Sequence, residues 1–272
     1  MAEVRPGKTN LEAWWELNEE SGTRVDAHGS NDLADNNTVL YDTLVKGNAA
    51  DFEKGNSESL SIADNASLSV ADVDFMFTTW LKPESIPGAD QDMIIAKGGG
   101  VGTREYQAYI TTTGSLAWVI YSSGEAGNTV VNSGAGTIIA GTKVFVVIKY
   151  DAGASELSVS LDAGSFTTAG SAVTPYDGSS IFRLGGRYAA IDSPYDGLMD
   201  ETNFWKGILT QDEINWLYNS GDGRAYSDFH PTPSIIAGVI AVIDPEIGTY
   251  DTRFKMRARK RDTALTARVR NE

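Results

Sequence analysis

Short apolar runs separated by turn-forming residues recur along most of this chain, and their spacing constrains the fold more than any other feature. Each run has the length of a β-strand, and 28 glycines are scattered between the runs as turn residues. Strands so short must bury one face against a second layer. The sequence therefore predicts an all-β fold of two antiparallel sheets. The expected strands are LEAWWELN at 11–18, AADF at 49–52, SLSI at 59–62, DFMFTTWLK at 74–82, DMIIAK at 92–97, EYQAYIT at 105–111, SLAWVIY at 115–121, VFVVIKY at 144–150, ELSVSL at 156–161, IFRLGG at 181–186 and GLMDETNFW at 197–205.

One short helix is predicted near 210–220. Thr210-Gln211-Asp212-Glu213 has the pattern of a capping box, in which the Thr210 hydroxyl and the Glu213 carboxylate satisfy opposite backbone amides. Ile214, Leu217 and Tyr218 extend its apolar face, and Gly221 is expected to end it in a left-handed conformation. These residues suit a packing element rather than a catalytic one.

The character of the chain changes after residue 229. His230-Pro231-Thr232-Pro233 is expected to be a linker, because proline stiffens the backbone and removes donors. Two strand-like segments follow at 252–261 and 263–270, with arginines alternating along them: Arg257, Arg259, Arg261, Arg268 and Arg270. Such an arm is too short to bury a core of its own, so we expect it to pair with another chain or with the body. The predicted divisions are an N-terminal segment at 1–10, a sandwich at 11–229, and the linker and basic arm at 230–272.

Charge and residue usage exclude several classes of function. The net charge of -15 divides into +5 for residues 251–272, which hold eight Lys/Arg against three Asp/Glu, and -20 for residues 1–250. An acidic body repels phosphate and argues against nucleic-acid binding there. With no cysteine and two histidines, thiolate chemistry and histidine-based triads are hard to build. The longest apolar run, at 234–243, is about half of a membrane-spanning helix, so no membrane insertion is expected.

The order of motifs across 11–224 resembles the laminin-G-like/concanavalin A-like jelly-roll family. The closing segment carries the resemblance most specifically, with YDGLMDE at 195–201 followed by a tryptophan and a capped helix. The chain departs from the family at 203–205, where a charged or tyrosine-rich strand is more usual. The other matching motifs are AWWELNEESGT at 13–23, AADF at 49–52, SLSI at 59–62, FTTWLKP at 77–83, IAKG at 95–98, LGG at 184–186 and LTQDEI at 209–214.

The resemblance implies a structural calcium ion. Relatives of this architecture often bind one Ca²⁺ where an N-terminal loop meets the penultimate strand, and the matching positions are Asp26, Asn31 and Asp200. Carboxylate and amide oxygens are suitable ligands for this hard cation. The alternative is that Asp26 and Asn31 are ordinary turn residues and that Asp200 caps a loop.

The same fold also occurs in retaining glycoside hydrolases, which need two carboxylates about 5–5.5 Å apart. Asp200 and Glu201 are adjacent on a predicted strand, so their side chains are expected to point to opposite faces. No Glu-x-Asp-x-Glu run occurs in the sequence. We therefore expect a protein that is not an enzyme.

Aromatic residues near predicted turns are candidates for stacking against sugar rings. Trp14, Trp80 and Trp205 match core positions of the family and are expected to be structural. The candidates expected to be exposed are Tyr106, Trp118, Tyr121, Tyr188 and Tyr195.

Two functions remain open at this stage. In the first, the sandwich is a non-catalytic binding protein that recognises a glycan or another host-surface ligand, and the arm anchors or oligomerises it on a virion. The arginine strands resemble repeats of tailed-phage structural proteins, which would make other virion proteins and further copies of the chain its partners. In the second, the chain is a structural decoration or joining protein that binds no ligand. Extracellular action without a signal peptide is the alternative to a virion location, and a glycoside hydrolase is a distant third function.

Overall fold

The structure is a computed structural model that describes residues 4–188 and 192–229, together with four C-terminal strands. The chain divides into two units, Met1–Ser227 and Asp228–Glu272. In the second unit, β16 (Ser234–Ile236) pairs with β17 (Val239–Ala241), and β18 (Arg257–Arg261) pairs with β19 (Ala264–Arg268). Within the described residues, no helix has the length and apolar character needed to cross a membrane.

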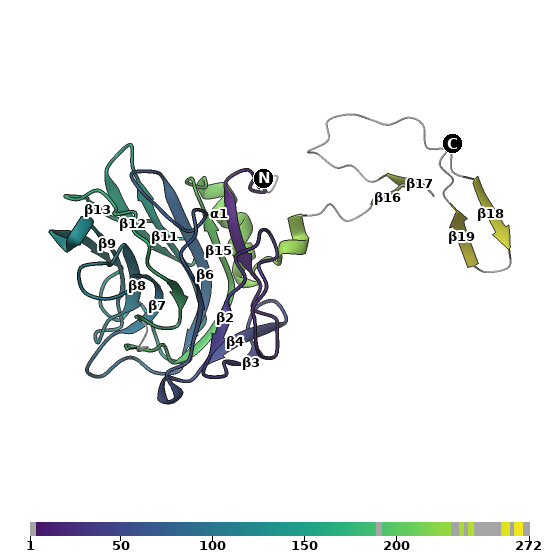
Figure 1. The fold of residues 1–272 in the computed structure, drawn as a ribbon. Helices are drawn as coiled ribbons and strands as arrows, with labels where there is room; N and C mark the ends of the chain where they lie inside the picture. The colour runs from purple at the N-terminus through teal and green to yellow at the C-terminus, as the bar shows by residue number, and fades with distance from the viewer. Residues whose placement is uncertain are drawn as a thin grey trace. The chain divides into compact units, whose positions relative to one another are not determined.

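The first unit consists of two antiparallel sheets, as predicted, and Figure 1 shows the larger one running from β13 to β3. Its strands lie in the order β13 (Thr167–Gly170), β12 (Glu156–Leu161), β11 (Val144–Asp151), β6 (Phe75–Pro83), β15 (Gly197–Trp205), β4 (Asn48–Phe52) and β3 (Leu40–Thr43), and β1 (Leu11–Trp15) also pairs with β15. The seven-stranded sheet has the order β10 (Asn128–Asn132), β9 (Leu116–Tyr121), β8 (Tyr106–Ile110), β7 (Asp92–Lys97), β14 (Phe182–Leu184), β5 (Ser59–Ile62) and β2 (Ala34–Asn36).

The core between the sheets comes from alternating positions on the long strands. Phe75 and Phe77 of β6 point inward, and Phe77 stacks on Phe204 of β15 with ring centroids 4.3 Å apart. Trp118 of β9 packs edge-on against Phe75 from the opposite sheet. Because these side chains are fully buried, the apolar area that they remove from water stabilises the sandwich.

The outer face of the larger sheet is covered by α1 (Gln211–Tyr218). The capping box is present, with Thr210 accepting from the Glu213 amide. The helix ends at Asn219, whose φ is 48°, so the prediction that Gly221 would end it is wrong. Trp80 stacks on Tyr218 with centroids 5.6 Å apart, so this tryptophan lies beneath the helix rather than between the two sheets.

Four strands of the sandwich were not expected from the sequence: β2, β3, β10 and β13. All four are the last strands of their sheets, and β3 and β13 are largely exposed. A strand with little buried area has little apolar alternation, and that alternation is the signal on which strand prediction depends.

In the basic arm the two arginine-bearing strands pair with each other, and the expected pairing with another chain or with the body stays a prediction. Arg257 is opposite Arg268, and Arg259 is opposite Thr266 in the β18–β19 hairpin. Arg261 is opposite Ala264. The linker at 230–233 and Arg270 lie outside the described residues.

Candidate functional site

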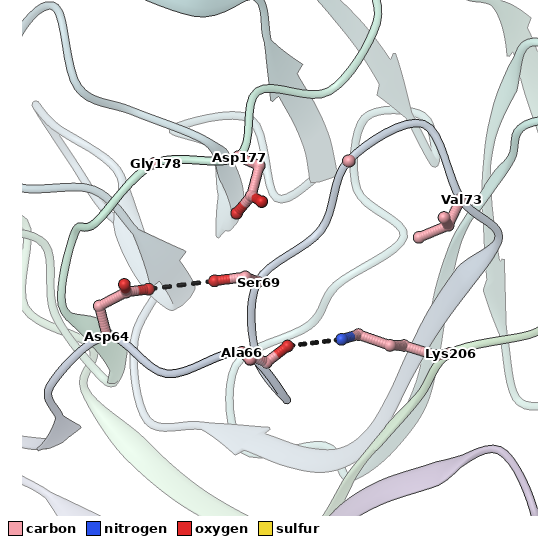
Figure 2. A pocket seen from close by; sticks show the side chains of 8 residues that line it. Asp64, Ala66, Ser69, Val73, Asp177, Gly178 and Lys206 are labelled. Atoms are coloured by element: carbon pink, nitrogen blue, oxygen red, sulfur yellow. Dashed lines mark hydrogen bonds between the residues drawn. The ribbon is translucent and has the colours of Figure 1, made fainter.

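The ends of several strands form a depression at one end of the sandwich, which we call the end pocket (Figure 2). The loop after β5, the segment before β14 and the residue after β15 meet there. Its volume is about 490 Å³, within the usual range for small-ligand sites. The pocket is lined by Asp64, Ala66, Ser69, Ala71, Val73, Asp177, Gly178 and Lys206.

A buried ionic group fixes the floor of the end pocket. The Lys97 ammonium lies 2.7 Å from Glu105 and 2.8 Å from Asp64, and the side chains of Lys97 and Glu105 are fully buried. Burial raises the pKa of Asp64, but the hydrogen bond and charge of Lys97 outweigh it and leave that pKa below its ordinary value. Asp64 is therefore an anion that orders the pocket and accepts a hydrogen bond from Ser69 at 3.1 Å.

Polar groups on the walls face the space above this floor. In Figure 2 the carboxylate of Asp177 points into the depression toward Ser69. Lys206 crosses the opposite wall and donates to the carbonyl of Ala66 at 2.6 Å. Ala71 and Val73 supply apolar surface beside these groups. A carboxylate, a hydroxyl and an amine beside an apolar wall can hold a polyol through hydrogen bonds and C–H contacts.

A second cluster lies on the outer face of the seven-stranded sheet. The Arg104 guanidinium lies 4.6 Å from the ring centre of Tyr121, and that of Arg187 lies 4.7 Å from the ring centre of Tyr188. Arg104 pairs with Glu125, whose pKa its hydrogen bond lowers to about 2. Arg187 pairs with Asp192 at 2.9 Å, and burial raises the pKa of Tyr121 to about 12. We call this cluster the tyrosine–arginine face; it comprises Arg104, Gln107, Tyr109, Tyr121, Arg183, Arg187 and Tyr188.

The candidate aromatic residues divide between this face and the core. Tyr121 and Tyr188 belong to the face, but Tyr121 is buried at 6% exposure, so the expectation that it is exposed is wrong. The expectation of exposure is also wrong for Tyr106, Trp118 and Tyr195, which are fully buried. Their polar atoms are bonded inside the protein, since Tyr106 donates to the Leu68 carbonyl and Trp118 to the Lys149 carbonyl. Nearness to a predicted turn did not separate core from surface, because these residues alternate with outward-facing ones on the same strands.

Asp200 and Glu201 lie on one face of β15, which corrects the expectation that they point apart. The register between β15 and β6 shifts between Asp200 and Asn203, and Glu201 has a φ of 46°. This bulge inserts an extra residue and turns the Glu201 side chain outward, where it accepts from Nε1 of Trp14. Asp200 points to the same side and accepts from the Val45 and Lys46 amides at 2.8 and 3.0 Å.

Both carboxyl groups are buried, although they lie on the outer face of the larger sheet. Asp200 is 0% and Glu201 2% exposed, and neither lines the end pocket. Burial raises the pKa of Asp200 to about 7, and burial together with the charge of Asp200 raises that of Glu201 well above its ordinary value. A raised pKa is typical of a general acid, but a buried group cannot reach a saccharide. We therefore interpret this pair as structural.

The residues proposed for calcium do not form one set of ligands. Both oxygens of Asp26 accept hydrogen bonds, Oδ1 from the amides of Trp14 and His28 and Oδ2 from the amide and the side chain of Asn31. Asp200 shares no hydrogen-bond partner with Asp26. Across the described ranges, no group of three or more His, Asp or Glu side chains is arranged to hold a metal ion. Asp26 and Asn31 therefore fit the turn interpretation better, and calcium binding stays a prediction.

The family model that matches the chain is the one described as the concanavalin A-like lectin/glucanases superfamily, over residues 54–215. The match covers more than half of the chain and includes most strands of both sheets. No protein with a curated description matches the sequence.

Solved structures with the same fold include receptor- and sugar-binding domains. The binding domain of Paraclostridial Mosquitocidal Protein 1 has a TM-score of 0.64 at 12% identity, over 78% of this chain and 52% of that one. The botulinum neurotoxin serotype G binding domain has a TM-score of 0.59 at 10% identity, over 77% and 50%. Domain 4 of an extracellular arabinanase from Geobacillus stearothermophilus, in complex with arabinotriose, has a TM-score of 0.56 at 15% identity, over 75% and 96%. The chain thus spans about half the length of the toxin domains, and at these identities the likeness establishes the fold.

Proposed function

The chain belongs to the concanavalin A-like lectin/glucanase superfamily, and from that premise we propose that its sandwich is a non-catalytic module that binds a glycan in the end pocket. The observation that carries this proposal is the combination of Asp177, Ser69 and Lys206 around an apolar wall at the end of a rigid sandwich. Binding residues commonly lie on loops that a rigid scaffold positions. The binding domains among the structural neighbours add support for recognition rather than chemistry.

The carboxylates of the end pocket suit recognition better than hydrolysis. Asp64 has a lowered pKa and is held by Lys97, so it lacks the raised pKa of a general acid. A retaining glycosidase needs a general acid with a raised pKa on one side of the scissile bond and an ionised nucleophile on the other. The buried acids whose pKa is raised, such as Asp200, do not line the pocket.

Binding to a panel of neutral saccharides tests the proposal. The affinity for the best neutral ligand is measured by calorimetry of the full chain. Asp177→Asn should bind that ligand at least about tenfold more weakly than wild type, because a charge-assisted hydrogen bond is lost. Asp222→Asn is the matched control, since Asp222 is exposed and does not line the pocket. Equal loss in both variants, or failure of every saccharide to bind, contradicts the end pocket as the site.

The same saccharides also test the hydrolase alternative. The wild-type chain is incubated with each bound saccharide, and reducing ends are measured. We expect no release of sugar. Release that disappears in Asp177→Asn would identify an enzyme instead.

We also propose that the basic arm anchors the module to a particle, such as a virion, or joins copies of the chain. The β18–β19 hairpin, in which Arg257, Arg259 and Arg261 alternate along β18, supports this proposal. An arm with these charges suits the acidic body of a neighbouring copy. The chain with Arg257, Arg259 and Arg261 all changed to glutamate should lose self-association in light scattering, while replacing the same three by lysine should keep it. An assembly state that is the same for all three proteins would contradict this role, and immunogold labelling of particles tests the location.

A further inference from the structure

We propose that the end pocket selects saccharides that carry a free primary amine, such as glucosamine units, and that Asp177 is the counter-ion of that amine. This inference rests on the proposed glycan site and names the chemical class of its ligand. The observation behind it is a carboxylate without a partner on the wall of a cavity large enough for a small ligand. A neutral sugar leaves that charge unpaired, whereas an ammonium group forms a charge-assisted hydrogen bond with it.

The segment that carries Asp177 is fastened to the buried ionic group beneath the pocket. The Gly178 carbonyl accepts from the Lys97 ammonium at 3.4 Å, and the Ser180 amide donates to Glu105 at 3.3 Å. The carboxylate of Asp177 is exposed and points into the depression, as Figure 2 shows. Among the described residues it makes no hydrogen bond and no ion pair. Both of its oxygens are therefore open to a ligand.

The other charged groups of the lining already have partners. Asp64 lies 2.8 Å from the buried Lys97 ammonium. The Lys206 ammonium donates to the Ala66 carbonyl at 2.6 Å on the opposite wall. Among the lining residues, all of which the structure describes, Asp177 is therefore the carboxylate that still lacks a cation.

The charge around the pocket favours a cationic ligand over an anionic one. Three carboxylates in and beneath the pocket, on Asp64, Asp177 and Glu105, are balanced by only two ammonium groups, on Lys97 and Lys206. Residues 1–250 as a whole carry a net charge of -20. An acidic saccharide is therefore repelled, and a sugar with an ammonium group is attracted.

The remaining lining suits a sugar ring rather than a bare cation. Ala71 and Val73 form an apolar wall, and Val73 is 42% exposed. The Ser69 hydroxyl lies between this wall and Asp64, to which it donates at 3.1 Å. Apolar surface with a few convergent polar groups is typical of small-molecule sites. Within the described ranges no group of three or more His, Asp or Glu side chains is arranged to hold a metal ion, so an organic ammonium fits better.

The experiment compares three trisaccharides that differ at C2 alone. The full chain is titrated by calorimetry with cellotriose, chitotriose and tri-N-acetylchitotriose, which carry hydroxyl, ammonium and acetamide groups at a pH below the pKa of the amines. We expect chitotriose to bind about threefold to fivefold more tightly than the other two, as an ion pair open to solvent contributes. The advantage should disappear in about 1 M salt, where the screening length is about 3 Å.

The outcomes separate the amine preference from the glycan site itself. Equal affinity for the three sugars, when all of them bind, overturns the amine preference and leaves the glycan site standing. If none of the three binds, the glycan site fails as well. N-acetyl-lysine amide supplies the ammonium without a sugar. If it competes as well as chitotriose, the ligand is a bare cation and the proposal is wrong.

Charge variants locate the preference in the pocket. Asp177→Asn should lower the ratio of chitotriose affinity to cellotriose affinity to about one, and Lys206→Gln should raise that ratio. Asp222→Asn is the matched control, because it removes the same charge from an exposed position outside the pocket and should keep the ratio. A ratio that is unchanged in Asp177→Asn, or that falls equally in Asp222→Asn, would show that the acidic body rather than the pocket attracts the amine.

Discussion

At the scale of single residues, the main finding is how differently carboxylates of the same type behave in this sandwich. Asp64 is paired with Lys97, and its pKa is lowered, whereas Asp200 accepts from two amides and has its pKa raised to about 7. Burial is the first cause in both, and the presence of a cation decides the direction. Asp64 therefore stays ionised in the end pocket, whereas Asp200 keeps its proton up to a much higher pH.

Replacing Asp200 by asparagine should change how stability depends on pH. The unfolded carboxyl group ionises near 3.8, whereas the folded one holds its proton to about 7, so the native wild type loses stability as the pH rises through this window. Asp200→Asn does not ionise, and its amide nitrogen would occupy the position of Oδ1, which has no partner. The free energy of unfolding of the variant should therefore rise relative to that of the wild type between pH 4 and pH 8, by up to about 4 kcal/mol.

Urea unfolding at both pH values measures this difference. Asp212→Asn, an exposed aspartate in the first turn of α1, is a control whose free energy of unfolding should not show the same trend. A stability difference between Asp200→Asn and wild type that is constant with pH would contradict the burial of an ionisable group at this position.

The buried lysine gives a second prediction at this scale. Lys97→Met removes the cation and leaves Glu105 buried without its charge partner, so we expect a loss of about 3–5 kcal/mol in the free energy of unfolding. The double variant Lys97→Met with Glu105→Gln should recover much of that loss, because no unpaired charge remains. Thermal and urea unfolding give both values, and equal stability of the single and double variants would contradict the pairing.

At the scale of elements, the helix cap offers a prediction tied to sequence. Thr210→Ala removes the acceptor of the Glu213 amide and should cost about 1 kcal/mol of stability. Thr210→Ser keeps the hydroxyl and should stay close to wild type. Because the helix covers Trp80, loss of the cap should also appear as a change in tryptophan fluorescence before global unfolding. Identical denaturation curves for the two variants would contradict the role of the cap.

The strands and the helix show how far the sequence alone can predict this fold. Apolar alternation predicted the long inner strands such as β6 and β15, and the capping box predicted α1, because each signal is local. The edge strands β3 and β13 gave no such signal, since their side chains face solvent. The bulge at Glu201 was equally hidden, because glutamate is not a residue that indicates a positive φ. That one torsion decides whether two adjacent acids share a face.

The candidate sites were harder to predict than the fold, because they combine residues far apart in sequence. Asp64 and Asp177 meet in the end pocket, and Gln107 and Arg183 are aligned by two strand pairings. Among the expected aromatic residues, Tyr121 and Tyr188 lie on the tyrosine–arginine face, and Tyr109 was missed although it lies two residues from Gln107 on the same face. Register, rather than composition, determines which of these side chains point outward.

At the scale of the whole molecule, the division at residue 227 leads to a prediction about stability. The first unit contains both sheets and α1, so a chain ending after residue 229 should melt at the same temperature as the full chain. Differential scanning calorimetry at several protein concentrations measures this. A lower melting temperature for the shortened chain would show that the arm contributes to the stability of the sandwich.

The calcium prediction is also tested through the stability of the whole molecule. If an ion is bound, EDTA should lower the melting temperature of the full chain by several degrees and added calcium should restore it. Asp26→Asn should then remove the response. An unchanged melting temperature in EDTA would reject the calcium prediction and leave Asp26 as a turn residue.

One segment of the sandwich connects the end pocket to the seven-stranded sheet. The amide of Tyr176 donates to the carbonyl of Tyr121 on the tyrosine–arginine face, and the next two residues, Asp177 and Gly178, line the end pocket. The backbone of this segment is therefore fastened to the seven-stranded sheet, and the position of Asp177 in the end pocket is set by the strand pairing before any ligand arrives. A ligand that uses Asp177 need not pay to order the loop that carries it.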